Sequence, residues 1–176
     1  MSHKADMSYT CAFIEELYRF RTLGPLGVPH KTNEDAALLG YKIPKGVQVW
    51  IKITCGSWVF CFVSTRSFVG QVMSNLWAVH NNPEYFEEPE KFKPERHLDS
   101  EGKFQKSKYV IPFSVGPRHC LGEQLARMEV FIFLVCLVQK FKFKASNADG
   151  SLPEIKKGSL GLAFVPLQFD VVAVER

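Results

Sequence analysis

The sequence predicts a mixed fold that is mainly helical and carries small β-hairpins. Three observations predict it: a run of helix formers near the N-terminus, a long apolar helical segment in the second half, and short strand-like runs beside turns rich in glycine and proline. The chain has 176 residues, of which 46% are hydrophobic and 13% aromatic, so we expect one globular domain over residues 1–176.

The first half of the chain begins with a predicted helix over Tyr9–Arg21, where apolar residues recur at helical spacing and Gly24 and Pro25 follow. From Ala36 to Ile51, two strand-like runs flank residues 40–46, whose glycines and proline favour a turn. We therefore expect a helix followed by a β-hairpin.

The second half begins with residues 81–118, which hold five prolines among charged and aromatic side chains and predict an ordered meander without regular structure. A long helix is predicted over Leu121–Phe141, and its apolar core, Val130–Val138, is expected to be buried. Alternating apolar runs at Leu160–Val165 and Phe169–Val174 predict a terminal strand pair.

Charge and hydropathy exclude several classes of protein. The net charge of +4 comes without any block of five like charges, so no nucleic-acid-binding tail is expected. The longest apolar run covers nine residues, whereas a membrane-spanning helix needs about twenty, so no membrane span is expected. The polar N-terminus has no apolar run behind it and predicts no signal peptide.

The five cysteines are an odd number and include no C-x-x-C pair, which argues against a disulfide framework and a zinc ribbon. Four of them are expected to pack as small hydrophobic side chains: Cys11, Cys55, Cys61 and Cys136. Cys120 differs because it directly precedes the long predicted helix, where backbone N–H groups and the helix dipole stabilise a thiolate sulfur. Such a thiolate is a soft ligand for iron.

The segment around Cys120 has the pattern F-x-x-G-x-R-x-C-x-G, and its fixed positions are Phe113, Gly116, Arg118, Cys120 and Gly122. This pattern resembles the heme-binding loop of the cytochrome P450 family. The resemblance implies that Cys120 is the axial ligand to the heme iron, that Arg118 holds a heme propionate, and that Phe113 packs near the sulfur. A cysteine nucleophile assisted by His119 or His30 is disfavoured, because an adjacent histidine cannot readily reach back to the sulfur.

Two further segments resemble the family in the expected order. Glu16 and Arg19 match its E-x-x-R helix, and Lys93–Arg96 matches a segment whose arginine completes a buried Glu-Arg-Arg network. The resemblance implies that Glu16, Arg19 and Arg96 hold the meander beneath the heme, a structural role. The family commonly has an aromatic residue where His97 stands.

The segment Leu23–His30 looks like the family's strand beside the heme, especially in microsomal branches that act on drugs, steroids and fatty acids. The resemblance implies that His30 faces a heme propionate. It also implies that Leu26, Val28 and Leu162 line the substrate side.

The resemblance implies the C-terminal part of the cytochrome P450 fold: the E-x-x-R helix, a β-hairpin, the meander, the cysteine loop, the long helix and a terminal strand pair. It covers nearly the whole chain apart from the extreme N-terminus and residues 52–74. In the family, the strand after Pro44 runs almost directly into the segment that begins at Asn75. We therefore suspect that residues 52–74 are an insertion or derive from non-coding sequence.

By resemblance, the function is that of a heme-thiolate monooxygenase, which inserts one oxygen atom of O₂ into a lipophilic substrate. Its electrons come ultimately from NADPH through a flavoprotein reductase, which in the family docks on a basic surface near the cysteine. The basic residues close to it in sequence are Lys103, Lys106, Lys108, Arg118 and Arg127.

The family's distal helix and membrane anchor are expected upstream of Met1. Family members typically lie on the cytosolic face of the endoplasmic reticulum membrane, and this chain without an anchor is expected in the cytosol. The alternative function is a truncated, non-catalytic remnant, or an incomplete gene model, that lacks the distal half of the heme pocket.

Overall fold

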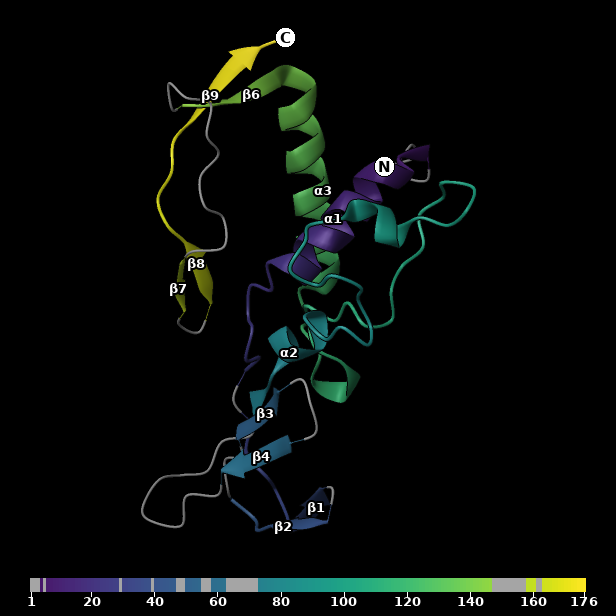
Figure 1. Cartoon of the computed structure of the whole chain (residues 1–176). Helices are drawn as coiled ribbons and strands as arrows, with labels where there is room; N and C mark the ends of the chain where they lie inside the picture. The colour runs from purple at the N-terminus through teal and green to yellow at the C-terminus, as the bar shows by residue number, and fades with distance from the viewer. Residues whose placement is uncertain are drawn as a thin grey trace.

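The computed structural model describes residues 4, 6–28, 30–38, 40–46, 50–54, 58–62, 73–146, 158–160 and 163–176. Its centre is formed by helices α1 (Ser8–Phe20) and α3 (Glu123–Lys140), which contact each other, and strand pairs lie toward both ends of the molecule (Figure 1). Both helices begin and end within two residues of the predicted ranges. A short helix α2 (Leu76–His80) also contacts α1.

The meander is irregular in structure, as its prolines predict. Its first 3₁₀ turn, η2 (Pro94–His97), packs against α1. A second 3₁₀ turn, η3 (Gly116–Arg118), leads toward α3. The meander therefore connects α2 to α3 while remaining in contact with α1, which places its backbone carbonyls within reach of side chains on that helix.

The predicted hairpin over residues 36–51 forms with a different turn. Strand β1 (Ala36–Leu38) pairs antiparallel with β2 (Tyr41–Ile43), and the pair Leu38–Tyr41 ends the ladder, so the chain does not reverse over 40–46 as predicted. Gly40 has φ +83°, a conformation that glycine adopts without strain and that permits this tight reversal.

The second strand-like run of the predicted hairpin, which ends at Ile51, pairs with other strands. Strand β3 (Trp50–Thr54) pairs antiparallel with β4 (Trp58–Phe62) and parallel with β5 (Met73–Ser74).

The terminal strand pairing was predicted wrongly. Strand β9 (Val171–Glu175) pairs antiparallel with β6 (Phe141–Ala145), which directly follows α3. The other predicted run does not pair with β9, because β8 (Phe164–Pro166) pairs antiparallel with β7 (Gly158–Leu160). The β6–β9 ladder pairs all five residues of each strand.

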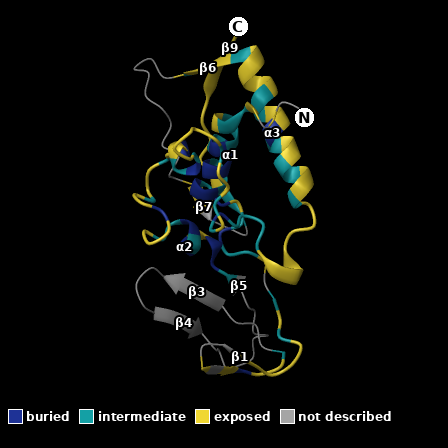
Figure 2. Ribbon diagram, turned by 90° about the vertical axis from the view of Figure 1, so that its right-hand side faces the viewer, coloured by how far each residue is buried: buried dark blue, intermediate teal, exposed yellow. Residues whose placement is uncertain are grey.

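The core lies around α1, whereas α3 is mostly exposed (Figure 2). Phe131 is the buried residue of α3, while Ile132, Phe133 and Val138 are exposed, so the prediction of a buried helix at Val130–Val138 was wrong. A helix that is apolar on most of its circumference needs a covering layer on each side, and the described chain supplies one only along part of it.

The exposure of α3 also corrects the prediction that Cys136 packs as a small hydrophobic side chain. Cys136 on α3 is exposed and Cys11 is half-buried, whereas the side chains of Cys55 and Cys61 lie outside the described residues. Within the described ranges, no helix combines the length and the apolar character that crossing a bilayer requires.

Candidate functional site

Cys120 lies between the turn η3 and the first turn of α3. Its backbone N–H donates a hydrogen bond of 2.9 Å to the carbonyl of Phe113, and its own carbonyl accepts the N–H of Glu123 at 3.4 Å. The residue is exposed. Backbone hydrogen bonds therefore fix the loop on both sides of the cysteine while its side chain stays accessible.

The tight path of this loop depends on two left-handed residues. Gly116 has φ +76°, and Ser114, which is not a glycine, has φ +66°. No atom lies within 4 Å of a Cβ built on Gly116, so glycine is required there for its backbone conformation and not for space. A non-glycine residue with positive φ is uncommon and concentrates at functional sites.

The surroundings of the Cys120 sulfur fit a porphyrin iron. The sulfur is exposed, and a Cβ built on Gly122 would come to 3.8 Å from Sγ, an ordinary van der Waals contact. In the part of the chain that is described, no group of three or more histidine, cysteine or carboxylate side chains could hold a metal ion. A single thiolate suits a metal that brings its remaining ligands with it, as porphyrin iron does.

The other residues assigned to the cofactor and substrate are less closely grouped. Arg118 is exposed in η3, and His30 is half-buried in a separate segment. Leu26 is half-buried and Val28 is 67% exposed. Leu162 lies outside the described residues. The structure thus brings the five residues of the cysteine motif into one loop, and no interaction links His30 to that loop among the described residues.

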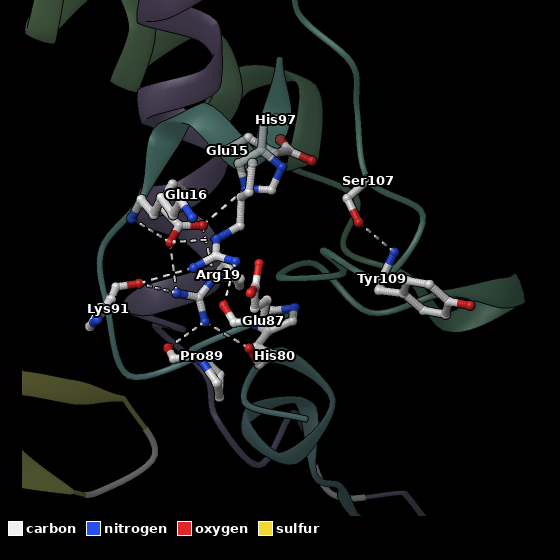
Figure 3. A network of polar contacts seen from close by, with 12 residues as sticks. Glu15, Glu16, Arg19, His80, Glu87, Pro89, Lys91, His97, Ser107 and Tyr109 are labelled. Carbon is white, nitrogen blue, oxygen red and sulfur yellow. Dashed lines mark hydrogen bonds and ion pairs between the residues drawn. The ribbon is translucent and has the colours of Figure 1, made fainter. Parts of the chain in front are cut away.

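Glu16, Arg19 and Arg96 form one buried cluster (Figure 3 shows Glu16 and Arg19). Arg19 donates from Nε to Glu16 Oε2 at 2.8 Å and from Nη2 to Oε1 at 2.7 Å, and both side chains are fully buried. Arg96 Nε donates to Oε1 at 3.2 Å. The geometry is the forked pairing of a guanidinium with a carboxylate, which satisfies both charges without water.

The cluster also holds the meander backbone. Arg19 donates to the carbonyls of His80, Pro89 and Lys91 at 2.9, 2.9 and 3.1 Å (Figure 3). The N–H of Lys93 donates to Glu16 Oε1 at 3.0 Å. One buried ion pair on α1 therefore satisfies the polar groups of a segment that has no regular structure of its own.

Electrostatics favour the ionised form of Glu16. Burial by itself raises the pKa of this carboxyl, but hydrogen bonds from Arg19, from His97 and from the Lys93 N–H, together with the charge of Arg19, lower it to about 2. Glu16 therefore stays charged at every physiological pH and keeps its donors in place.

Two buried histidines join this region and had not been assigned to it from the sequence. His97 lies 3.0 Å from Glu16 through Nε2. His80 accepts the Ile111 N–H at Nε2, 2.8 Å away, and its Nδ1 lies 2.5 Å from Thr22 Oγ1. Burial and the nearby Arg19 lower the pKa of His80 to about 4, so its ring is neutral and donates from Nδ1 to Thr22.

The sequence carried a signal for one of these histidines. His97 stands where the family commonly has an aromatic residue, so the sequence marked this position as unusual. It did not predict that the side chain bonds to Glu16. His80 lies in the segment 75–83, which also resembles a family segment, but the sequence did not reveal its contacts, because its partners Thr22 and Ile111 are 58 and 31 positions away.

Known proteins resemble this chain along its length. A family model described as Cytochrome P450 matches residues 1–55 and 70–172. Cytochrome P450 2U1 of Rattus norvegicus and Cytochrome P450 2L1 of Panulirus argus are each 38% identical to it over 176 residues, and Cytochrome P450 2D4 of Rattus norvegicus is 41% identical over 176 residues. The matches cover 100% of this chain but only 28%, 31% and 30% of these relatives. The chain therefore belongs to the cytochrome P450 family, and its relatives fit the microsomal-type branch.

Proposed function

We propose that this chain forms the cysteine-bearing side of a heme-thiolate monooxygenase, with Cys120 as the axial ligand to the heme iron. The observation that carries the proposal is the accessible Cys120 thiol, held by backbone hydrogen bonds at the start of α3. Family membership supports the same reaction class. Because the chain spans 28–31% of the relatives named above, the activity of a whole protein is part of the proposal.

The residues of the cysteine motif have separate roles in this proposal. Cys120 supplies the thiolate, Arg118 and His30 hold heme propionates, and Phe113 restrains the environment of the sulfur. Gly116 and Gly122 allow the loop to pass close to the cofactor. When bound, a thiolate-ligated heme supplies the chemistry that cleaves O₂ and inserts one oxygen atom into a C–H bond.

The Glu16 cluster holds the meander that precedes the cysteine loop and takes no part in the chemistry. Its ionised carboxylate and the two arginines fix the meander, and the meander leads directly into the cysteine loop. We assign Glu16, Arg19 and Arg96 a structural role for this reason.

Substrate and partners follow the family. We propose a lipophilic substrate that contacts Leu26, Val28 and Leu162, and electrons that come from NADPH through a flavoprotein reductase. The basic residues of the meander offer an acidic reductase a complementary surface. A location on the cytosolic face of the endoplasmic reticulum membrane belongs to the same proposal.

The absorption spectrum of the reduced, carbon-monoxide-bound chain with added heme tests this proposal. The wild-type chain should give the long-wavelength band of a thiolate ligand, and Cys120→Ala should lose it. Cys136→Ala is the matched control, because Cys136 is also an exposed free cysteine but lies far along α3. A thiolate band that survives in Cys120→Ala and disappears in Cys136→Ala contradicts the assignment.

We further propose that residues 52–74 contain an insertion relative to the family. The family match leaves out residues 56–69, which supports this idea. Sequencing of the transcript tests it: reads that skip this stretch and extend upstream of Met1 favour the monooxygenase, and a transcript that begins at Met1 favours the non-catalytic remnant.

A further inference from the structure

Arg127 is the basic residue of α3 that contacts both α1 and the cysteine loop. Its Nε donates to Glu123 at 2.8 Å, and its Nη1 donates to Glu15 Oε2 at 3.2 Å. Glu15 belongs to α1, and its side chain is only 3% exposed, against 22% for Arg127. Two carboxylates on different helices therefore fix the plane and position of this guanidinium.

The same guanidinium lies against two aromatic rings. Its Cζ is 5.1 Å from the ring centroid of Tyr18 and 5.2 Å from that of Phe113, within the range of a cation–π interaction. The two rings also meet edge to face, with centroids 5.4 Å apart. Arg127, Tyr18 and Phe113 are therefore mutual neighbours, and both Tyr18 of α1 and Arg127 of α3 contact the Phe113 ring.

Phe113 connects this cluster to the cysteine. Its carbonyl accepts the backbone N–H of Cys120 at 2.9 Å. The position of Phe113 therefore fixes the backbone amide of the residue that carries the sulfur. We infer that Arg127 is a positioning residue for Cys120, acting through Phe113 and anchored by Glu15 and Glu123. This inference rests on the proposed function only in taking Cys120 as the heme ligand.

The contacts also separate Arg127 from the basic residues that could dock a partner. Its charge is already compensated by two carboxylates, and two aromatic rings lie against it. Lys103, by contrast, has a side chain that is 72% exposed and pairs only with the exposed Glu101 in the described residues. Removing Arg127 should therefore disturb the loop, whereas removing Lys103 should disturb only surface charge.

Amide hydrogen exchange of the full 176-residue chain without heme tests the positioning directly. Arg127→Gln should speed exchange at the Cys120 amide about 10-fold while amides in α1 keep their protection, because the opening is local. Arg127→Lys should give a smaller increase in the same direction, since lysine keeps the charge but has no planar fork. Lys103→Gln is the matched control and should leave both regions unchanged.

Two results would overturn the inference. One is an unchanged Cys120 amide in both Arg127 variants. The other is an equal loss of protection at Cys120 and throughout α1 in Arg127→Lys, the milder variant, which would mean a general loss of stability and not a local role.

A second measurement tests the role of Arg127 separately from the proposed heme ligation. With heme added, Arg127→Gln should weaken the thiolate band of the carbon-monoxide complex more than Lys103→Gln does. A wild-type chain that shows no thiolate band contradicts the proposed function, yet the exchange experiment still decides whether Arg127 positions Cys120.

Discussion

The imidazole Nε2 of His97 lies 3.0 Å from Oε2 of the fully buried Glu16 carboxylate. Since an ionised carboxylate only accepts hydrogen bonds, Nε2 carries the proton and donates the hydrogen bond to Oε2. Oε2 then has donors from His97 and from Arg19 Nε, while the other oxygen receives Arg19, Arg96 and the Lys93 N–H. His97 thus donates a hydrogen bond to Glu16 from a position where the family commonly has an aromatic residue.

Glu16→Gln should lower the free energy of unfolding by about 3 kcal/mol, because it leaves the buried Arg19 guanidinium without its counter-charge. Urea denaturation at neutral pH measures the change. Glu101→Gln is the control: it removes a carboxylate of an exposed pair and should leave the midpoint in place. Equal effects of the two substitutions would rule out a stabilising role for the buried cluster.

His97→Phe should destabilise the chain less than Glu16→Gln does, by about 1 to 2 kcal/mol, the contribution of one hydrogen bond to a charged group. Oε2 keeps the Arg19 donor, and phenylalanine supplies the ring that the family commonly has at this position. The same urea titration measures the loss. A destabilisation as large as that of Glu16→Gln would mean that His97 is the principal donor of the cluster.

His80 should make stability depend on pH. Its pKa is lowered to about 4 in the folded chain, from an ordinary value of 6.5, so the unfolded chain binds more protons between these values. Its stabilising contribution is therefore complete above pH 6.5 and is lost as the pH falls to 4. A depression of this size corresponds to about 3 kcal/mol.

Urea titrations between pH 7 and pH 4 measure this dependence. His80→Gln should flatten the curve in that window, because glutamine keeps an acceptor for the Ile111 N–H but does not titrate. His119→Gln removes an exposed histidine and should leave the curve as it is in the wild type. If His80→Gln leaves the pH dependence of the free energy of unfolding unchanged, that dependence comes from another group.

Gly116→Ala and Gly102→Ala form a matched pair. Both glycines have φ near +75°, and neither has an atom within 4 Å of an added Cβ, so each substitution should cost about 1 kcal/mol of backbone strain. The expected difference lies in the cofactor: only Gly116→Ala should reduce the thiolate band of the heme-loaded chain. Equal thiolate bands for both variants would show that heme binding does not depend on the left-handed conformation of Gly116.

Local patterns predicted those elements whose stability is local. Helices α1 and α3 lie within two residues of their predicted ranges, because apolar spacing, terminal charges and breakers are encoded in adjacent residues. Strand pairing was predicted less well. Strand β9 pairs with β6, which lies 30 residues earlier in the chain, and not with the nearer run at 160–165, and neighbouring residues do not carry that information.

The sequence by itself predicted the family, singled out Cys120 among the five cysteines and named the three members of the Glu16 cluster, because a motif fixes residue types at fixed spacing. Only the tertiary structure decided that His97 and His80 are buried beside Arg19, that Arg127 reaches Phe113, and that most of α3 is exposed. Burial and hydrogen-bond partners arise from segments far apart in the chain, and they depend on how those segments pack and not on the residues beside them.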